Sequence, residues 1–165
     1  MAVQTVSFAA QVNDFVRQTQ RRMEAVFRES AQRVVAEMQK PEGAGGHMPV
    51  DTNYLRASLQ MTKGAPVPLE EKSPKGGATV AYTPDAASLV IAGAEIGETL
   101  YASYTAAYAR RVNYGFEGQD SLGRTYNQPG KQFVALAAQQ WPKIVTDVCS
   151  DLKTRIEARQ ASGGR

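Results

Sequence analysis

Residues 7–40, SFAAQVNDFVRQTQRRMEAVFRESAQRVVAEMQK, decide the fold that we expect for this chain. Their apolar side chains recur three or four positions apart, with charged and amide residues between them, as on one face of a helix. These side chains are Phe8, Val12, Phe15, Met23, Val26, Phe27, Ala31, Val34, Val35 and Met38. Ser7 can accept a hydrogen bond from a first-turn N–H, and Pro41 ends the run. The stretch predicts one long amphipathic helix with at most one bend or break.

A second helical pattern lies near the end of the chain. Its apolar face contains Phe133, Ala137, Trp141, Ile144, Val145, Val148, Leu152 and Ile156. Pro129 suits the first turn of this helix, and Pro142 should kink or split it. From Ala158 the sequence ARQASGGR loses the apolar spacing, so residues 158–165 are expected to form a flexible basic tail.

Three short stretches between these helices predict strands. Residues 57–62 are expected to form a first strand. Residues 87–92 and 99–104 are rich in the β-branched and aromatic side chains that strands favour, and GAEIGE separates them. We therefore expect an antiparallel hairpin of residues 87–92 and 99–104.

The connecting segments predict one short helix and several loops. Residues 106–114 have helical spacing, and Gly115 can end that helix by adopting a positive φ. Residues 41–50 and 63–77 are rich in proline and glycine, which indicates loops, and 63–77 should be exposed and mobile. The segment from residue 116 to Gln128 is polar and is also expected to be a loop.

The length and composition indicate one globular domain, and the order of the expected helices and strands indicates the α+β class. The chain has 165 residues, of which 42% are hydrophobic and 21% charged, so it can bury a single core. We expect long N- and C-terminal helices packed on a small antiparallel sheet of about three strands, with one short helix. This domain should cover residues 1–157.

Charge and hydropathy limit the partners. The net charge of +3 permits contact with nucleic acid or an acidic partner, although so small an excess is more often a solubility feature. No apolar run is long enough for a bilayer, and the start of the chain lacks a secretion signal, so no membrane contact is expected. Cys149 is the only cysteine, which fits a small buried side chain and a reducing cytoplasm.

We find no catalytic, cofactor-binding or metal-binding set in the sequence. His47 is the only histidine and lies in a glycine-rich loop, where we expect it to be solvent-exposed. The carboxylates Asp85, Glu95 and Glu98 are scattered over expected turns and are not paired as an acid and a base. The sequence therefore predicts a protein that is not an enzyme and needs no cofactor.

Two groups of arginines remain. The expected first helix carries Arg17, Arg21, Arg22, Arg28 and Arg33, but acidic residues between them indicate mainly a solvated face with local ion pairs. The short helix brings together Tyr108, Arg110, Arg111 and Tyr114, and tyrosine and arginine are favoured at interface centres. We expect these four residues to contact another subunit, while phosphate binding and a plain surface stay open.

Three pieces of sequence resemble one known family. Residues 49–59, PVDTNYLRASL, resemble the P-V-D-T-G-x-L-R-x-S motif of the phage tail-completion proteins, also called neck or minor tail proteins of the Z type. Residues 108–115, YARRVNYG, are similar to the family's Y-A-x-x-V-E-Y-G, and the stretch from Pro129-Gly130 through Phe133 to Trp141-Pro142 is similar to its last loop and helix. The order of the pieces matches, and the resemblance covers roughly residues 7–157. Asn53 and Asn113 depart from the usual glycine and glutamate, and the second change removes a charge.

The resemblance implies a structural virion protein of the head-to-tail junction. It would join the tail to the DNA-filled head as part of a ring of copies, expected to be sixfold, between connector and tail-terminator proteins. Genomic double-stranded DNA would pass through the lumen, and the particle would assemble in the cytoplasm of the bacterial host. A nucleic-acid-binding domain that uses the first helix and the C-terminal tail is the alternative; a nuclease or toxin-like enzyme is a weaker one.

The first piece also carries structural expectations. Asp51 or Thr52, after Pro49, should cap a short turn, because their side chains can accept hydrogen bonds from first-turn N–H groups. Leu55 and its neighbour Tyr54 should pack inward. Arg56 should reach a carboxylate or a carbonyl group.

Overall fold

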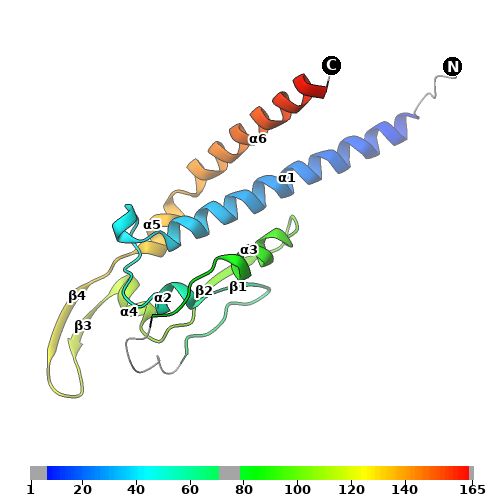
Figure 1. The fold of residues 1–165 in the computed structure, drawn as a ribbon. Coiled ribbons are helices and arrows are strands. Elements are labelled where there is room, and N and C mark those ends of the chain that lie inside the picture. The colour runs from blue at the N-terminus through cyan, green and yellow to red at the C-terminus, as the bar shows by residue number, and fades with distance from the viewer. Residues whose placement is uncertain (1–6, 71–78, 164–165) are drawn as a thin grey trace.

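The computed structural model describes residues 7–70 and 79–163 and shows an α+β fold (Figure 1). Two long helices run side by side, and the smaller elements gather around one end of them. In chain order the elements are α1 (Phe8–Gln39), the 3-10 turn η1 (Glu42–Ala44), α2 (Tyr54–Ala57), β1 (Leu59–Lys63), α3 (Asp85–Ala92), β2 (Leu100–Tyr104), α4 (Ala109–Tyr114), β3 (Gly115–Gln119), β4 (Thr125–Pro129), α5 (Phe133–Gln139) and α6 (Trp141–Gly163).

The first long helix forms as predicted. α1 is continuous over 32 residues, and Ser7 caps it by accepting a hydrogen bond of 3.3 Å from the Ala10 N–H. Lys40 takes an extended conformation and ends the helix before Pro41. The half of α1 nearer its C-terminus is partly buried, with Ser30, Met38 and Gln39 almost fully covered, whereas the half nearer its N-terminus is exposed.

The last helical region is split, as the position of Pro142 predicted. α5 ends at Gln139 and α6 starts at Trp141, which places Pro142 in a first turn, where its missing N–H costs no helical bond. The expected start at Pro129 was wrong, because Pro129 pairs with Gly115 in a sheet. The expected loss of helix at Ala158 was also wrong, since α6 continues to Gly163.

The strand expected at residues 87–92 was wrong. This segment is α3, which starts after Pro84 with the Ser88 N–H donating to the Pro84 carbonyl oxygen. Burial on α3 is one-sided: Ile91 is 1% exposed and Leu89 is 77% exposed. The expected hairpin of residues 87–92 and 99–104 therefore does not exist, and α3 packs on α1 and β1 instead.

The two sheets pair different segments from those that we expected. β1 and β2 are antiparallel, with Leu59 opposite Tyr104 and Lys63 opposite Leu100, although about forty residues separate them in the chain. β3 and β4 form a second antiparallel pair, so the loop expected from residue 116 to Gln128 was wrong. The described residues thus form two sheets of two strands in place of the expected sheet of about three.

The main core lies between the end of α1, the first sheet and α5. The ring of Phe133 is 1% exposed and meets the ring of Tyr104 edge-on, with centroids 5.2 Å apart. Burial raises the pKa of Tyr104 well above its ordinary value. The buried members of this cluster are Met38, Met48, Leu55, Tyr104, Ala106, Ala109, Phe133 and Ala137.

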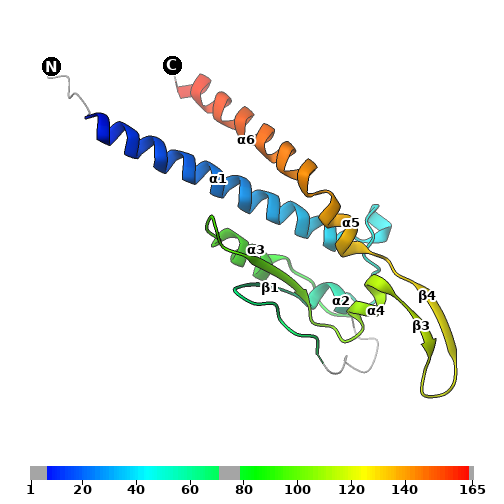
Figure 2. The same cartoon turned by 180° about the vertical axis from the view of Figure 1, so that it is seen from behind.

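The second long helix packs against the first. α6 runs antiparallel to α1, and Ile144 and Val148 are buried on α6. Arg33 on α1 forms an ion pair of 2.7 Å with Asp151 on α6. The N-terminus of α1 and the C-terminus of α6 therefore lie at the same end of the molecule, opposite the β3–β4 hairpin (Figure 2).

The structure tests the loops predicted at the proline- and glycine-rich segments to different extents. Residues 41–50 are irregular, as predicted, apart from η1 and a bridge between Pro41 and the fully buried Met48. The expected mobile connection at 63–77 lies partly outside the described residues. Within residues 7–70 and 79–163, no helix combines the length and hydropathy that a membrane span needs.

Candidate subunit-contact surface

The motif at residues 49–56 forms a tight turn that leads into α2. Asn53 holds it with a φ of 60°, a left-handed conformation that asparagine tolerates better than most residues, as glycine does. Asn53 is the residue at the helix N-terminus and makes no side-chain cap bond, so the expected cap by Asp51 or Thr52 was wrong. Its side-chain oxygen accepts instead from Arg56 Nη1, at 3.3 Å.

Leu55 and Tyr54 pack inward, as predicted. Leu55 is 5% exposed and belongs to the main core. Tyr54 packs on the edge of that core, and its hydroxyl donates to Glu70 Oε2 over 2.7 Å. This hydrogen bond, with burial, raises the pKa of Tyr54.

Arg56 lies on the other side of the turn. Its guanidinium group stacks over the ring of Tyr82, 4.1 Å from the centroid. Burial is the main cause of a raised pKa at Tyr82, and the nearby guanidinium opposes it. Arg56 therefore reaches the side-chain carbonyl oxygen of Asn53 and an aromatic face.

The first two motif pieces meet in one pocket. The rings of Tyr54 and Tyr108 have centroids 6.2 Å apart. Pro49, Asp51 and Thr52 line the same pocket of about 340 Å³, together with Val112 of the second piece. Segments more than fifty residues apart in the sequence therefore build a single surface feature.

The four residues that we expected at a subunit contact are divided between two environments. Tyr108 is half-buried against Tyr54, and burial raises its pKa. Arg110 and Tyr114 are exposed, Tyr114 to 71%. Arg111 is exposed too, and its guanidinium stacks on Phe116 with 4.6 Å to the ring centroid.

Asn113, which replaces the family's glutamate, holds α4 to α5. It is 4% exposed, and its Oδ1 accepts a hydrogen bond of 3.2 Å from the Val134 N–H in the first turn of α5. Its carbonyl oxygen also accepts from the Gln132 N–H, over 2.8 Å. The uncharged side chain thus satisfies one first-turn donor of α5, and the backbone carbonyl satisfies the N–H of the residue before that helix, so this contact needs no ion pair.

The β3–β4 hairpin extends the surface beyond α4. All five residues of β4 are exposed, and the hairpin projects away from the rest of the molecule (Figure 2). The rings of Phe116 and Tyr126 meet diagonally across the two strands, with centroids 6.3 Å apart. Arg111, Phe116 and Tyr126 also line one shallow pocket, so aromatic and guanidinium groups gather on this face.

Asp120 organises the tip of the hairpin. Its carboxylate accepts from the Leu122 and Arg124 N–H groups, from Arg124 Nε at 2.6 Å and from the Tyr126 hydroxyl at 3.2 Å. Desolvation opposes ionisation, but these hydrogen bonds outweigh it and hold the pKa of Asp120 below its usual value. Gly123 completes the turn with a φ of +77°.

Two glycines let backbone segments pass closely at the base of the hairpin, Gly130 beside the end of α4 and Gly115 beside β4. A Cβ at Gly130 would lie 2.4 Å from the Tyr114 carbonyl carbon, and a Cβ at Gly115, where φ is +90°, would lie 2.7 Å from the Gln128 carbonyl oxygen. Both neighbours are backbone atoms, which cannot rotate away. Glycine is therefore required at both positions.

We expect Gly130→Ala to lower the free energy of unfolding by about 1–3 kcal/mol, because the added methyl group forces the two backbone segments apart. Urea denaturation followed by circular dichroism would measure this loss. Gly43→Ala is the matched control, since nothing lies within 4 Å of its Cβ position. Equal stability of the two variants would contradict the close approach.

The structure also shows the surroundings of the residues that were screened for chemistry. His47 is exposed, as expected, and Glu98 forms an ion pair of 2.8 Å with Lys63. Cys149 is exposed, so the expectation of a buried thiol was wrong. No three His, Cys, Asp or Glu side chains gather as metal ligands in the part of the chain that the structure describes.

Comparison with models of protein families, with curated proteins and with solved structures found no match.

Sequence reasoning missed the hairpin, although one signal pointed to it. Asp120 and Gly123 have the spacing of a tight turn, and an aromatic residue lies on each side, at Phe116 and Tyr126. The sequences of β3 and β4 lack a continuous alternation of apolar and polar residues, because both faces of the hairpin are largely solvent-exposed.

Proposed function

We propose that this chain is a structural subunit of the head-to-tail junction of a long-tailed bacteriophage, where copies form a ring that joins the tail to the DNA-filled head. The observation that carries the proposal is the meeting of the two motif pieces in one pocket, with Tyr54 beside Tyr108. Both pieces resemble tail-completion proteins. The two pieces lie far apart in the sequence, and their contact in the fold supports a common role for them.

The exposed surface supports an interaction role. A two-stranded hairpin is marginally stable without a packing partner, and the β3–β4 hairpin leaves most of both faces open. It carries aromatic residues beside Arg111, and these residue types dominate the centres of protein interfaces. The proposal therefore places α4 and the hairpin against a neighbouring subunit, either another copy or a connector or tail-terminator protein.

Localisation in particles tests this proposal. Electron microscopy of purified particles, with an antibody or a fused density on this chain, should place several copies at the neck, between head and tail. A sixfold ring is the expected arrangement. The proposal fails if the chain is absent from particles or occupies the junction as a single copy.

The arginines of α4 allow a second, independent test. Arg110→Ala with Arg111→Ala should leave the melting temperature nearly unchanged, because both side chains are exposed. The double variant should reduce the number of heads joined to tails, counted by electron microscopy and by infectious titre. Arg155→Ala with Arg159→Ala on α6 is the control with the same change in charge. Equal titres for the two double variants would show that Arg110 and Arg111 are ordinary surface residues.

Nucleic-acid binding is a second candidate function, favoured by the exposed arginines of α1. Arg17, Arg21 and Arg22 lie on the projecting half of that helix, and none of them is ion-paired to a carboxylate of the described residues. Counterion release makes such binding strongly dependent on salt. A DNA affinity of the isolated chain that falls steeply between low and physiological salt would favour this function over the structural one.

A further inference from the structure

The first sheet has an open strand edge at β2. The Thr105 N–H donates to the Ser58 carbonyl oxygen over 3.0 Å, one position beyond the paired residues of β1 and β2. In an antiparallel pair, such bonded positions alternate with positions whose N–H and C=O groups point outward. The backbone groups of Leu100, Ala102 and Tyr104 therefore face away from β1, and within residues 7–70 and 79–163 they have no hydrogen-bond partner.

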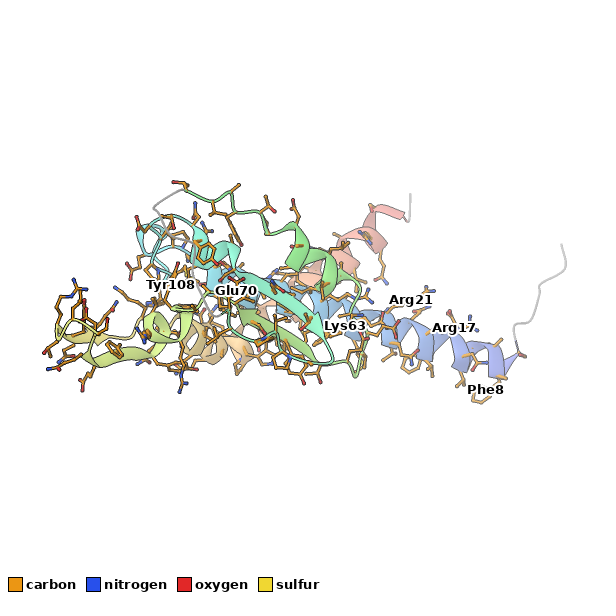
Figure 3. The ribbon with its side chains drawn as sticks, turned by 90° about the horizontal axis from the view of Figure 1, so that it is seen from below. Phe8, Arg17, Arg21, Lys63, Glu70 and Tyr108 are labelled. Carbon is orange, nitrogen blue, oxygen red and sulfur yellow. The ribbon has the colours of Figure 1, made fainter. Side chains whose placement is uncertain are left out.

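The other described strand edges are flanked or protected. α3 packs on β1, and Lys63 at the end of β1 (Figure 3) donates from its Nζ to the Gly93 carbonyl oxygen over 2.6 Å. β4 ends in Pro129, which has no N–H, and β3 carries Glu117. Charges and prolines of this kind keep sheet edges from pairing with other chains. β2 has the sequence LYASY and contains neither.

An apolar groove lies beside this open edge. It has a volume of about 330 Å³ and is bounded by α1, the first sheet and the start of α6. Leu100 and Ala102 line it from β2, and Trp141, which is 39% exposed, lines it from α6. Glu98 is the only charged residue of the described chain that lines it, and Glu98 is ion-paired to Lys63 over 2.8 Å. The groove therefore suits an uncharged occupant.

Edge and groove together specify an extended strand as the occupant. Outward N–H and C=O groups at every second residue match the backbone of another strand, which is how sheets bind extended polypeptides. Opposite residues of paired strands share one face of a sheet. The side chains opposite Leu100 and Ala102 would thus lie on the groove face and must be small or apolar.

β2 of a second copy meets this requirement. When two β2 strands run antiparallel with Ala102 opposite Ala102, Leu100 lies opposite Tyr104 in both directions, and every outward position is paired. This register brings only uncharged side chains to the groove face, and the smallest lies in the centre, where Ala102 is exposed. β4 does not fit in the same way, because its outward residues Thr125 and Asn127 would bring polar side chains to the groove.

We propose that two free copies pair through their β2 strands in this register and form one four-stranded sheet, in the order β1, β2, β2, β1. A sheet of two strands is marginal, whereas three or more strands with an apolar face make a stable unit. The two-fold axis passes between the Ala102 residues and brings both grooves to the same face. Each copy then covers apolar surface of the other, including the edge beside Trp141.

The inference goes beyond the proposed function. A two-fold contact uses the same surface on both copies and is complete with two of them, so it does not join the neighbours of a ring. The dimer is therefore the form of the free chain, in which an unprotected strand edge is covered before assembly. The ring of the proposed function forms after the dimer opens.

Self-association of the full chain tests the inference. Sedimentation velocity at concentrations up to about 0.1 mM should show a dimer, and Ala102→Lys should weaken it at least about tenfold, because two like charges would lie directly opposite each other. Ala102 is exposed in the single copy, so this variant should keep the far-ultraviolet circular dichroism of the wild type. Gln60→Lys, at an exposed position of β1, is the control and should change the dissociation constant less than about threefold. A wild-type chain that stays monomeric, or an equal loss in the control, overturns the inference.

A charge exchange at the same position tests the register. Ala102→Glu should weaken the dimer as much as Ala102→Lys does. Mixing the two variants should restore dimers that neither forms alone, because only the mixed pair places opposite charges across the axis. Restoration requires that residue 102 of one copy lie beside residue 102 of the other. A mixture no better than its components overturns the assignment to β2.

Cysteine crosslinking tests the same contact independently. Bonded residues of an antiparallel pair have Cα atoms about 5.5 Å apart, which a disulfide can span. Ala102→Cys with Cys149→Ser, which removes the exposed native thiol, should give a crosslinked dimer under mild oxidation. Gln60→Cys with Cys149→Ser is the control and should stay uncrosslinked. Equal crosslinking of the two variants overturns the inference.

Other contacts give distinct results. A dimer that withstands Ala102→Lys but is lost in Phe8→Ala with Phe15→Ala would use the exposed phenylalanines of α1 and overturn the inference. A chain that is monomeric alone, yet present in several copies at the neck of particles, would overturn the inference and leave the proposed function standing. A dimer that depends on Ala102, from a chain that is absent from particles, would do the reverse.

Discussion

Phe133→Ala is expected to lower the free energy of unfolding by about 3–5 kcal/mol, the usual cost of removing a buried phenylalanine ring. Phe133 is 1% exposed, and its ring packs edge-on against Tyr104 at 5.2 Å. It joins α5 to the first sheet and to the end of α1, so the cavity would open in the centre of the main core. A domain of this size has about 5–15 kcal/mol of stability in total, and the variant should therefore be close to unfolding at 37 °C.

Urea denaturation followed by far-ultraviolet circular dichroism would measure this loss. Leu122→Ala is the control, because Leu122 is 75% exposed at the hairpin tip, and its replacement should change stability by less than about 0.5 kcal/mol. A Phe133 variant as stable as the control would mean that the main core does not depend on α5.

Leu55→Ala is expected to cost about 2–5 kcal/mol, because Leu55 is 5% exposed within the same core. This side chain is the buried residue of α2, so its removal loosens the whole motif turn from the core. Thermal and chemical denaturation would give the same ranking, with Phe133→Ala as the more damaging change.

The control for Leu55 is Leu69→Ala, since Leu69 is 47% exposed. A loss below about 0.5 kcal/mol for Leu55→Ala would falsify the inward packing and make the motif a surface feature. Leu55→Met should recover most of the stability, because it keeps the volume of the side chain.

The long helices and the motif turn were predictable because their signals are local. Ser7, the apolar spacing after it and Pro41 define α1 without any knowledge of its partners. Pro142 likewise predicted the break between α5 and α6. At α3 the local signal misled, because Leu89, Val90 and Ile91 suit a strand or a short buried helix equally well.

The candidate surface was only partly predictable. Tyr108, Arg110, Arg111 and Tyr114 could be chosen from residue type, but the sequence could not show that Tyr108 would meet Tyr54 or that Arg111 would stack on Phe116. Those contacts join segments whose separation depends on the whole fold. The role of Asn113 was hidden for the same reason, because its partner is the Val134 N–H of a later helix.

The sequence by itself determined the α+β class, the position and cap of α1, the split at Pro142 and the inward packing of Leu55. Each depends on neighbours within a few residues or on one apolar side chain that must avoid water. Only the tertiary structure decided that β1 pairs with β2 and that residues 115–129 form a hairpin. Strand pairing is set by backbone hydrogen bonds between distant segments, and backbone groups are nearly the same in every residue. Only the tertiary structure showed that the apolar face of α1 extends, bare, beyond the part that the rest of the chain covers, because the covered length depends on where distant elements pack.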